Sequence, residues 1–335
     1  MDNLTHVLCA TALAKSRLGR ADRLAPAALI LAANLPDLDV IARFWGKAAF
    51  LVHHRGITHA VVGLAAQLLV LGAAALALRR PRLLPAIAIG LLSHPLLDLL
   101  NTYGVRPWLP FDHTRWYGDL VFVVDPWLWL LFGGATALAG PRSRWGSVAL
   151  SLMAAVATFF LYSSGRAPAA LEVVWPAAVG ALAVLRLRHR LRSTPVLAAA
   201  GLLTVLYLGL CAGAGAAARG RALRVLPAAE RPCAVTASVH PADPFEWTVV
   251  METERQVLWY PVRLLGLDGP RLAVSRNLDD PRVRRAAATP AGRAWLYFAR
   301  HPMAEVVGDR VRLMDARYQL GLLAGWPTLE VPVAP

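Results

Sequence analysis

Long apolar runs separated by short polar stretches dominate the first two thirds of the chain. A helix needs about 20 mostly apolar residues to cross a bilayer, and six of the runs approach that length. Two shorter apolar runs precede them and predict short or tilted helices. The pattern therefore predicts an all-α membrane bundle of about eight segments, some of them short. In chain order the runs cover residues 4–14, 24–35, 57–78, 83–100, 120–139, 146–162, 169–185 and 195–218.

The pattern changes from about residue 226, where prolines, charges and short alternating runs replace the long apolar segments. Alternation over five to ten residues is typical of strands. We predict a small soluble α+β domain, large enough to have its own core. The domain division is a membrane-embedded part over residues 1–222 and an extramembrane part over residues 223–335. The predicted elements are strands at 246–253, 255–265, 271–275 and 310–318, and an amphipathic helix at 282–300 interrupted by Pro290.

Composition and charge agree with a membrane protein. Hydrophobic residues make up 57% of the chain, whereas soluble domains have about 45–50%. The net charge of +14 could indicate a nucleic-acid partner, but the basic residues cluster between apolar segments, at 15–23, 79–82, 142–144 and 186–192. Such clusters mark cytoplasmic loops. We therefore predict no nucleic-acid binding, and a multi-pass membrane protein with its C-terminal domain outside the cytoplasm.

The stretch from Ser93 to Gly104 carries the most distinctive chemistry. His94 and Asp98 are four residues apart in an otherwise apolar run. On a helix this spacing places both side chains on one face, one turn apart. Burying them costs several kcal/mol unless each finds a partner. A shared cation is one such partner.

Further histidines and acids stand at the ends of neighbouring segments. His6 opens the first segment, Asp37 and Asp39 follow the second, and Asp125 opens the fifth. His6 could simply be an interfacial histidine, and Asp37 and Asp39 could solvate the end of a helix or form a turn. The loop His53-His54-Arg55-Gly56-Ile57-Thr58-His59 could contact lipid headgroups. It could also supply a metal ligand at His59 and an oxyanion clamp, because arginine binds oxyanions bidentately.

The charge pattern places these side chains on the same, outer side of the membrane. Scattered polar residues would have no reason to select one side. Imidazoles and carboxylates together suit zinc or a comparable first-row metal. More candidates exist than one tetrahedral site needs, so two ions, or one ion with surrounding partners, both remain open. The candidates are His6, Asp37, Asp39, His59, His94, Asp98 and Asp125.

Taken in order, the motifs resemble one family over residues 1–130. The motifs are Thr5-His6, Pro36-Asp37-Leu38-Asp39, His54-Arg55-Gly56-Ile57-Thr58-His59 and His94-x-x-x-Asp98-x-x-Asn101-x-Tyr103-Gly104. They look like the YdjM-like bacterial inner-membrane proteins, especially the longer YfhP-like members. The resemblance implies a membrane-embedded metal-dependent hydrolase, distantly similar to zinc phospholipase C.

The resemblance and the residues together give a predicted site at the extracytoplasmic face. The metal ligands are His6, Asp37, His59, His94 and Asp98, holding one or two divalent ions, with Zn²⁺ the first choice. Such an ion lowers the pKa of a water ligand to about 7. Asp39 is the predicted general base, and Arg55 and His54 hold the anionic group. Asn34, Asn101 and Asp125 are additional ligands or orienting partners. The predicted partners are membrane lipid and a lipid-like or phosphoester substrate.

Two other classes of function remain open. A regulatory or structural membrane protein could use the metal only as a staple of the helix bundle. An ion-coupled transporter could use the acids and histidines as a relay. The transporter needs polar residues through the whole membrane depth, and the last three apolar segments carry none comparable except Glu172.

Overall fold

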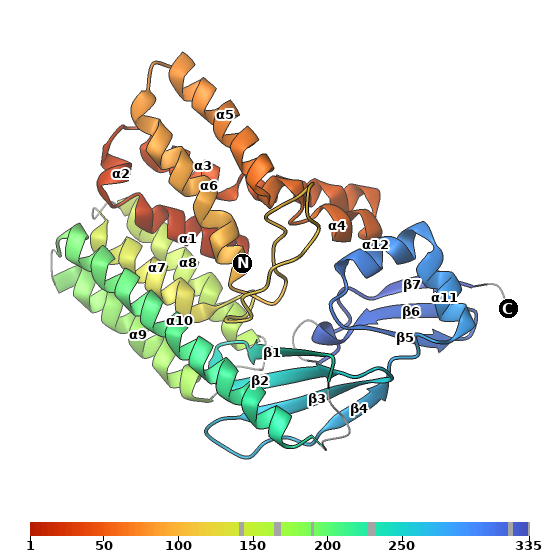
Figure 1. The fold of residues 1–335 in the computed structure, drawn as a ribbon. Helices are drawn as coiled ribbons and strands as arrows, with labels where there is room; N and C mark the ends of the chain where they lie inside the picture. Colours follow the sequence, from red (N-terminus) through yellow and green to blue (C-terminus); the bar gives the residue numbers. More distant parts are fainter. Residues whose placement is uncertain (141–143, 164–168, 189–190, 227–231, 321–323, 334–335) are drawn as a thin grey trace. The chain divides into compact units, whose positions relative to one another are not determined.

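The computed structural model describes residues 1–140, 144–163, 169–188, 191–226, 232–320 and 324–333. Two residues of the predicted basic clusters, Arg142 and Arg190, lie outside the described residues. The chain forms two compact units (Figure 1). Unit 1 comprises residues 1–38, 57–211 and 241–243, and unit 2 comprises 39–56, 212–240 and 244–335. The predicted division into membrane-embedded and extramembrane domains at residue 222 stays a prediction.

Unit 1 is built of helices, and each of the eight predicted apolar runs overlaps one of them or the long helix α10. The 3₁₀ helix η1 (Pro36–Trp45) and the long helix α10 (Ser193–Arg224) begin in unit 1 and end in unit 2. The other helices of unit 1 are α1 (Asn3–Leu13), α2 (Arg17–Arg20), α3 (Ala25–Asn34), η2 (Ile57–His59), α5 (Val61–Ala77), η3 (Pro81–Leu83), α6 (Leu84–Leu99), α7 (Pro126–Ala139), α8 (Arg144–Ser163) and α9 (Ala169–Arg188).

Local sequence sets where the key helices begin. The Asp2 carboxylate accepts a hydrogen bond from the Thr5 backbone N–H at 3.1 Å and caps α1. Helix α7 begins at Pro126 rather than at residue 120, because Asp125 caps it and proline favours the first helical position. Small residues let α3 and α6 pack closely, as at Ala32 and Gly90.

Only some of these helices are long enough to be membrane spans. By length and composition three helices of the described chain could cross a membrane: Pro81–Leu99, Gly146–Ser163 and α10. The number rises to five if each of two bent helix pairs counts as one span. Helices α1 and α7 are apolar but shorter. The predominantly helical N-terminal region is thus confirmed, whereas the count of eight membrane segments is not.

Unit 2 contains two antiparallel sheets. A four-stranded sheet has the order β1-β2-β3-β4, and a three-stranded sheet has the order β5-β6-β7. In the first sheet Val250 pairs with Trp259, and in the second Ala304 pairs with Leu313. The strands are β1 (Ala234–His240), β2 (Asp243–Glu252), β3 (Gln256–Arg263), β4 (Leu272–Ser275), β5 (Pro302–Val307), β6 (Arg310–Asp315) and β7 (Leu329–Pro332), and the short elements are α4 (Lys47–His53), α11 (Pro281–Ala288), α12 (Pro290–Phe298) and η4 (Ala316–Tyr318).

The two sheets share a hydrophobic core. Val250, Val257 and Trp259 pack with Met303 and Ala316, and the Trp259 indole donates to the Ala316 carbonyl at 2.8 Å. All four predicted strands are present, and the predicted helix is interrupted at Pro290 as expected. Thr289 ends α11 and caps α12, because its hydroxyl accepts from the Gly292 N–H at 3.0 Å.

Candidate metal centre

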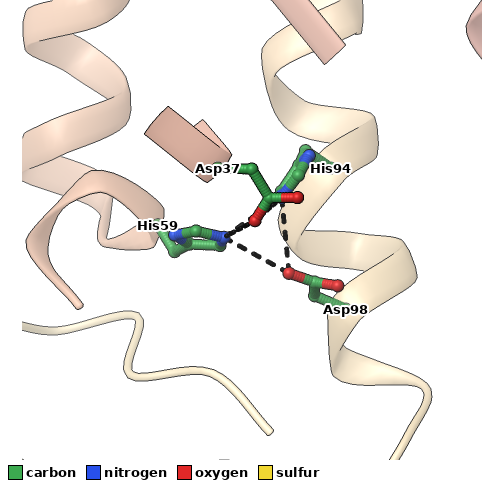
Figure 2. Close-up of side chains that lie close together, drawn as sticks. All are labelled: Asp37, His59, His94 and Asp98. Atoms are coloured by element: carbon green, nitrogen blue, oxygen red, sulfur yellow. Dashed lines mark hydrogen bonds and ion pairs between the residues drawn. The ribbon is translucent and has the colours of Figure 1, made fainter. Parts of the chain in front are cut away.

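Four side chains of unit 1 converge on one point, and together we call them the tetrad: Asp37, His59, His94 and Asp98 (Figure 2). One ligand atom from each lies within 4.8 Å of all the others. Asp37 comes from η1, His59 from η2, and the other two from α6. Two imidazole nitrogens and two carboxylate oxygens at this spacing could hold a metal ion.

The ligand atoms of the tetrad lie close together, although they cannot all form hydrogen bonds with one another. The two Nε2 atoms of His59 and His94 lie 3.1 Å apart. Asp98 Oδ2 lies 3.3 Å from His59 Nε2 and 3.4 Å from His94 Nε2. Asp37 Oδ1 lies 3.6 Å and 3.5 Å from the same two nitrogens. Both imidazoles therefore direct Nε2 into one space, and the two carboxylates face that same space.

Helix α6 fixes half of the tetrad through its own geometry. His94 and Asp98 are one turn apart on a buried face, and neither side chain is exposed to solvent. Gly90 lies one turn earlier on that face and lets α3 approach closely. His94 Nδ1 then reaches the backbone carbonyl of Ala33 on α3 at 2.6 Å. A ring nitrogen held this way leaves Nε2 as the free ligand atom, as metal-binding histidines require.

His59 is held similarly from its other side. Its Nδ1 lies 2.9 Å from the hydroxyl of Thr58. The Thr58 backbone carbonyl accepts from the Gln67 side-chain amide of α5 at 2.7 Å, which fixes the short 3₁₀ turn that carries the imidazole. The ring orientation of both tetrad histidines is therefore set by partners outside the tetrad.

His6 provides an independent test of whether a cation fits here. It is fully buried, and its ring stacks on that of His94 with centroids 3.8 Å apart. Its Nε2 lies 3.3 Å from Asp98 Oδ1, yet neither ring nitrogen has a hydrogen-bond partner among the described residues. A buried imidazole without partners is costly. An ion beside Asp98 could take the Nε2 of His6 as a ligand, so the residues present fit a metal.

Asp98 also contacts groups outside the histidine cluster. The Met1 amino group forms an ion pair with Asp98 Oδ1. Asn101 is fully buried near the same place: its Nδ2 lies 3.6 Å from the Met1 sulfur, and its Oδ1 accepts from the Tyr103 N–H at 2.9 Å. Asn101 thus shapes the loop behind the tetrad and is not one of its members.

Three predicted catalytic residues, Asp39, His54 and Arg55, lie together in unit 2. His54 Nδ1 lies 2.8 Å from Asp39 Oδ1, and the Arg55 backbone N–H donates to Asp39 Oδ2 at 2.9 Å. Arg55 has a φ of +52°, a conformation that non-glycine residues rarely adopt, and its side chain is buried. The structure thus joins these three residues around one carboxylate. Their catalytic roles stay predictions.

The two remaining predicted residues, Asn34 and Asp125, each form a hydrogen bond with the backbone of their own helix. The Asn34 side chain donates to the Ile30 carbonyl at 2.8 Å within α3. The Asp125 carboxylate caps α7 and accepts from the Tyr207 hydroxyl at 2.8 Å. Neither belongs to the tetrad. The Ala33 carbonyl and the Thr58 hydroxyl were not predicted as orienting partners, because backbone carbonyls occur at every position and threonine is common.

Comparison with known proteins gives the family. A family model described as YdjM inner membrane protein matches residues 1–168, half of the chain. The chain belongs to the YdjM inner membrane protein family. The match to the YdjM family contains the whole tetrad and His6, and it ends before the sheets of unit 2. Together with the apolar helices it indicates a membrane protein, and it confirms the resemblance. No curated protein and no solved structure matches the chain.

Proposed function

We propose that this YdjM-family chain is a membrane-embedded, metal-dependent hydrolase that acts on an ester, foremost a phosphoester, of a lipid-like molecule at the extracytoplasmic face. The observation that carries the proposal is the tetrad: four ligand atoms from three elements gathered within 4.8 Å. The orphaned nitrogens of His6 beside Asp98 support it independently. The extracytoplasmic side rests on the distribution of basic residues along the sequence.

The residues that would hold the ion are His59, His94, Asp37 and Asp98, with His6 beside them. A divalent cation such as Zn²⁺ held there would supply Lewis acidity toward the ester and make a water ligand acidic at neutral pH. The protein's part is orientation. Ala33 and Thr58 hold the two imidazoles with Nε2 directed inward, and burial of Asp98 excludes competing water.

Asp37 differs from its partners in a way that favours catalysis. Its side chain is 12% exposed, whereas those of His59, His94 and Asp98 are 0% exposed. Solvent and substrate would therefore reach the ion past Asp37. The proposal keeps Asp39 as the general base and Arg55 with His54 as the oxyanion clamp, because of their positions in the sequence. Asp39 follows Asp37 by two residues, and Arg55 precedes His59 by four.

A purely structural metal is the second candidate, and one observation favours it. The tetrad offers four protein ligands, the number typical of closed structural sites, whereas catalytic zinc sites keep three and an open position. In that case the ion would only staple η1, η2 and α6 together, and the chain would be a regulatory or structural membrane protein.

The experiment that separates these functions uses the detergent-purified full chain. Metal content is measured by elemental analysis, and hydrolysis is measured with bis(p-nitrophenyl) phosphate and with a mixed phospholipid substrate, with and without chelator. We expect bound metal and chelator-sensitive hydrolysis, both abolished in Asp98→Asn. The matched control is His113→Ala, which removes an exposed loop histidine outside the tetrad and should keep both.

Each result decides between the candidates. Stoichiometric metal with no hydrolysis of either substrate class would favour the staple and contradict the hydrolase. Absence of bound metal from a well-folded preparation would contradict both. Full activity in Asp98→Asn would remove the tetrad from the reaction.

A further inference from the structure

A cavity of about 320 Å³ lies within unit 1, among helices α1, α7, α8 and α9. This volume is in the range of small-molecule sites, about 300–1,000 Å³. Its walls are largely apolar, with Leu8, Trp129, Ala157, Trp175 and Leu182 among the lining residues. The cavity is separate from the tetrad, because none of the four tetrad residues lines it.

Small residues on two helices create this space. Gly133 and Gly134 line it from α7, and Ala154 and Ala157 from α8. A Cβ added at Gly133 would meet only Leu8, at 3.7 Å. Small residues in membrane helices usually allow the helices to touch. Here they line a cavity instead.

The two ends of the cavity differ in chemistry. Toward the beginning of α7 and α9 stand Trp129 and Trp175, whose indole N–H groups bond to Thr5 at 3.0 Å and Thr158 at 2.8 Å. Because their polar atoms are satisfied within the protein, these indoles present only hydrocarbon to the cavity.

The opposite end carries positive charge. Arg186, in the last turn of α9, lines the cavity, and its Nη2 lies 3.3 Å from the Ser147 hydroxyl at the start of α8. Lys15 lies nearby, after the end of α1, over Gly140 at the end of α7. Burial and the charge of Arg186 lower the pKa of Lys15. Two cations thus lie near each other, and no carboxylate among the described residues forms a salt bridge with Lys15.

We propose that this cavity binds one hydrocarbon chain of an anionic phospholipid, whose phosphate lies against Lys15 and Arg186. An apolar cavity with two basic side chains at one end is complementary to an amphiphile with an anionic head. Basic pockets between helices on the cytoplasmic side bind anionic headgroups in the same way. Both residues also belong to basic clusters that the sequence assigns to the cytoplasmic side.

The lipid site and the tetrad would share helix α1. Leu4 and Leu8 line the cavity, and His6 stands between them in the sequence. Residues two positions away on a helix point to roughly opposite faces. The phospholipid therefore packs on one face of α1 and the metal centre lies on the other, so the bound lipid is a structural ligand and not the hydrolysed substrate.

The test is a binding titration of delipidated, detergent-purified full chain, followed by native mass spectrometry. The probes are phosphatidylglycerol and phosphatidylcholine with identical acyl chains. We expect tighter binding of phosphatidylglycerol. Lys15→Gln should weaken phosphatidylglycerol binding about fivefold, since a basic residue near the lipid surface contributes about that much, and leave phosphatidylcholine binding unchanged. Arg17→Gln, which removes an exposed basic residue of the same cluster, is the matched control.

A second pair of variants tests the cavity itself. Ala154→Phe fills it and should weaken binding of both lipids at least about tenfold, and Gly133→Val is the milder alternative if the first variant misfolds. Gly209→Phe on α10, where an added Cβ meets nothing within 4 Å, is the control. Equal affinity for the two lipids in the wild type, or wild-type binding in both cavity variants, would overturn the proposal. Metal content, measured in parallel, reports separately on the tetrad.

Discussion

Each unit of the protein contains a buried cluster of histidine and carboxylate side chains. The two clusters differ in how their polar atoms are hydrogen-bonded. In unit 2, His301 is fully buried, with Nε2 at 2.7 Å from the Thr236 hydroxyl and Nδ1 at 2.8 Å from Glu252. Arg276 bonds to the other oxygen of Glu252 at 2.7 Å. We call these four residues the C-terminal network. Every member of it has a partner within the chain.

The tetrad shows the contrary arrangement. Two Nε2 atoms face each other at 3.1 Å, two carboxylates face the same space, and His6 has no hydrogen-bond partner among the described residues. Similar residue types therefore have different roles in the two units. A cluster that closes on itself stabilises a fold, since buried polar groups need partners. A cluster whose ligand atoms all point at one centre could hold a metal ion there.

Metal removal should produce the largest difference between the two units. An ion present at 1,000 times its Kd stabilises the state that binds it by about 4 kcal/mol. Chelation should therefore accelerate amide hydrogen exchange in α3 and α6 strongly, and leave β2 and β3 unchanged. The measurement is hydrogen exchange with mass spectrometry on the purified chain before and after chelation. Equal exchange in α6 in both states would mean that the tetrad closes without an ion.

Removing the histidine of the C-terminal network should have the next largest effect. His301→Ala leaves Thr236 and one oxygen of Glu252 without partners, and each unsatisfied buried group costs about 1–3 kcal/mol. We expect the sheets of unit 2 to lose about 2–4 kcal/mol of stability, measured as lost exchange protection in β1 and β2. Metal content should not change. His240→Ala, at the end of β1, is the control, and a drop in bound metal in His301→Ala would contradict the separation.

A smaller effect is expected from Gly90→Ala. The new Cβ would lie 2.8 Å from both Ala32 Cβ and the Leu29 carbonyl oxygen, so α3 and α6 must move apart. Such overpacking costs about 1–3 kcal/mol. Because the His94–Ala33 bond spans the same contact, metal affinity should fall about 10–100-fold, as when an orienting partner is lost. Competition with a chromophoric chelator measures it. Gly180→Ala on α9, where an added Cβ meets nothing within 4 Å, should have no effect.

Protonation of Asp315 on acidification should produce the smallest effect, and it should follow the loss of the ion. Burial would raise the pKa of Asp315, but the Arg317 guanidinium and the N–H groups of Arg300 and Arg317 hold it below its ordinary value. Its contribution to stability is complete above the unfolded pKa of about 3.9 and is lost as the pH falls further. Metal binding needs neutral imidazoles, so the ion should leave first. Stepwise dialysis with metal analysis and circular dichroism tests this order, and Asp315→Asn should remove the last acid-sensitive step.

The sequence predicted the parts of the tetrad that depend on local spacing. His94 and Asp98 are one helical turn apart, and any helix through them puts both on one face. The gathering of Asp37 and His59 was expected from topology. The orienting carbonyl of Ala33 was not expected, because which backbone carbonyl meets an imidazole depends on how closely α3 and α6 pack.

The C-terminal region shows a similar limit. Strands β2, β3, β4 and β6 were predicted from alternation, whereas β1, β5 and β7 were missed. Strand β7 has four residues and β5 begins with proline, so neither has a strong pattern of its own. Such strands are stabilised by the partner they pair with. The C-terminal network was equally invisible, since Glu252 and His301 are 49 positions apart.

The chain passes between the two units at both ends of residues 39–56. It leaves unit 1 directly after Leu38 and returns at Ile57, so residues 39–56 form an excursion that begins beside Asp37 and ends beside His59. An ion held by both would tie the ends of that excursion together and remove the entropy of an open loop. The coupling is reciprocal. If a ligand reorders residues 39–56, it changes the affinity of the protein for the ion by the same factor by which the ion changes the affinity for that ligand.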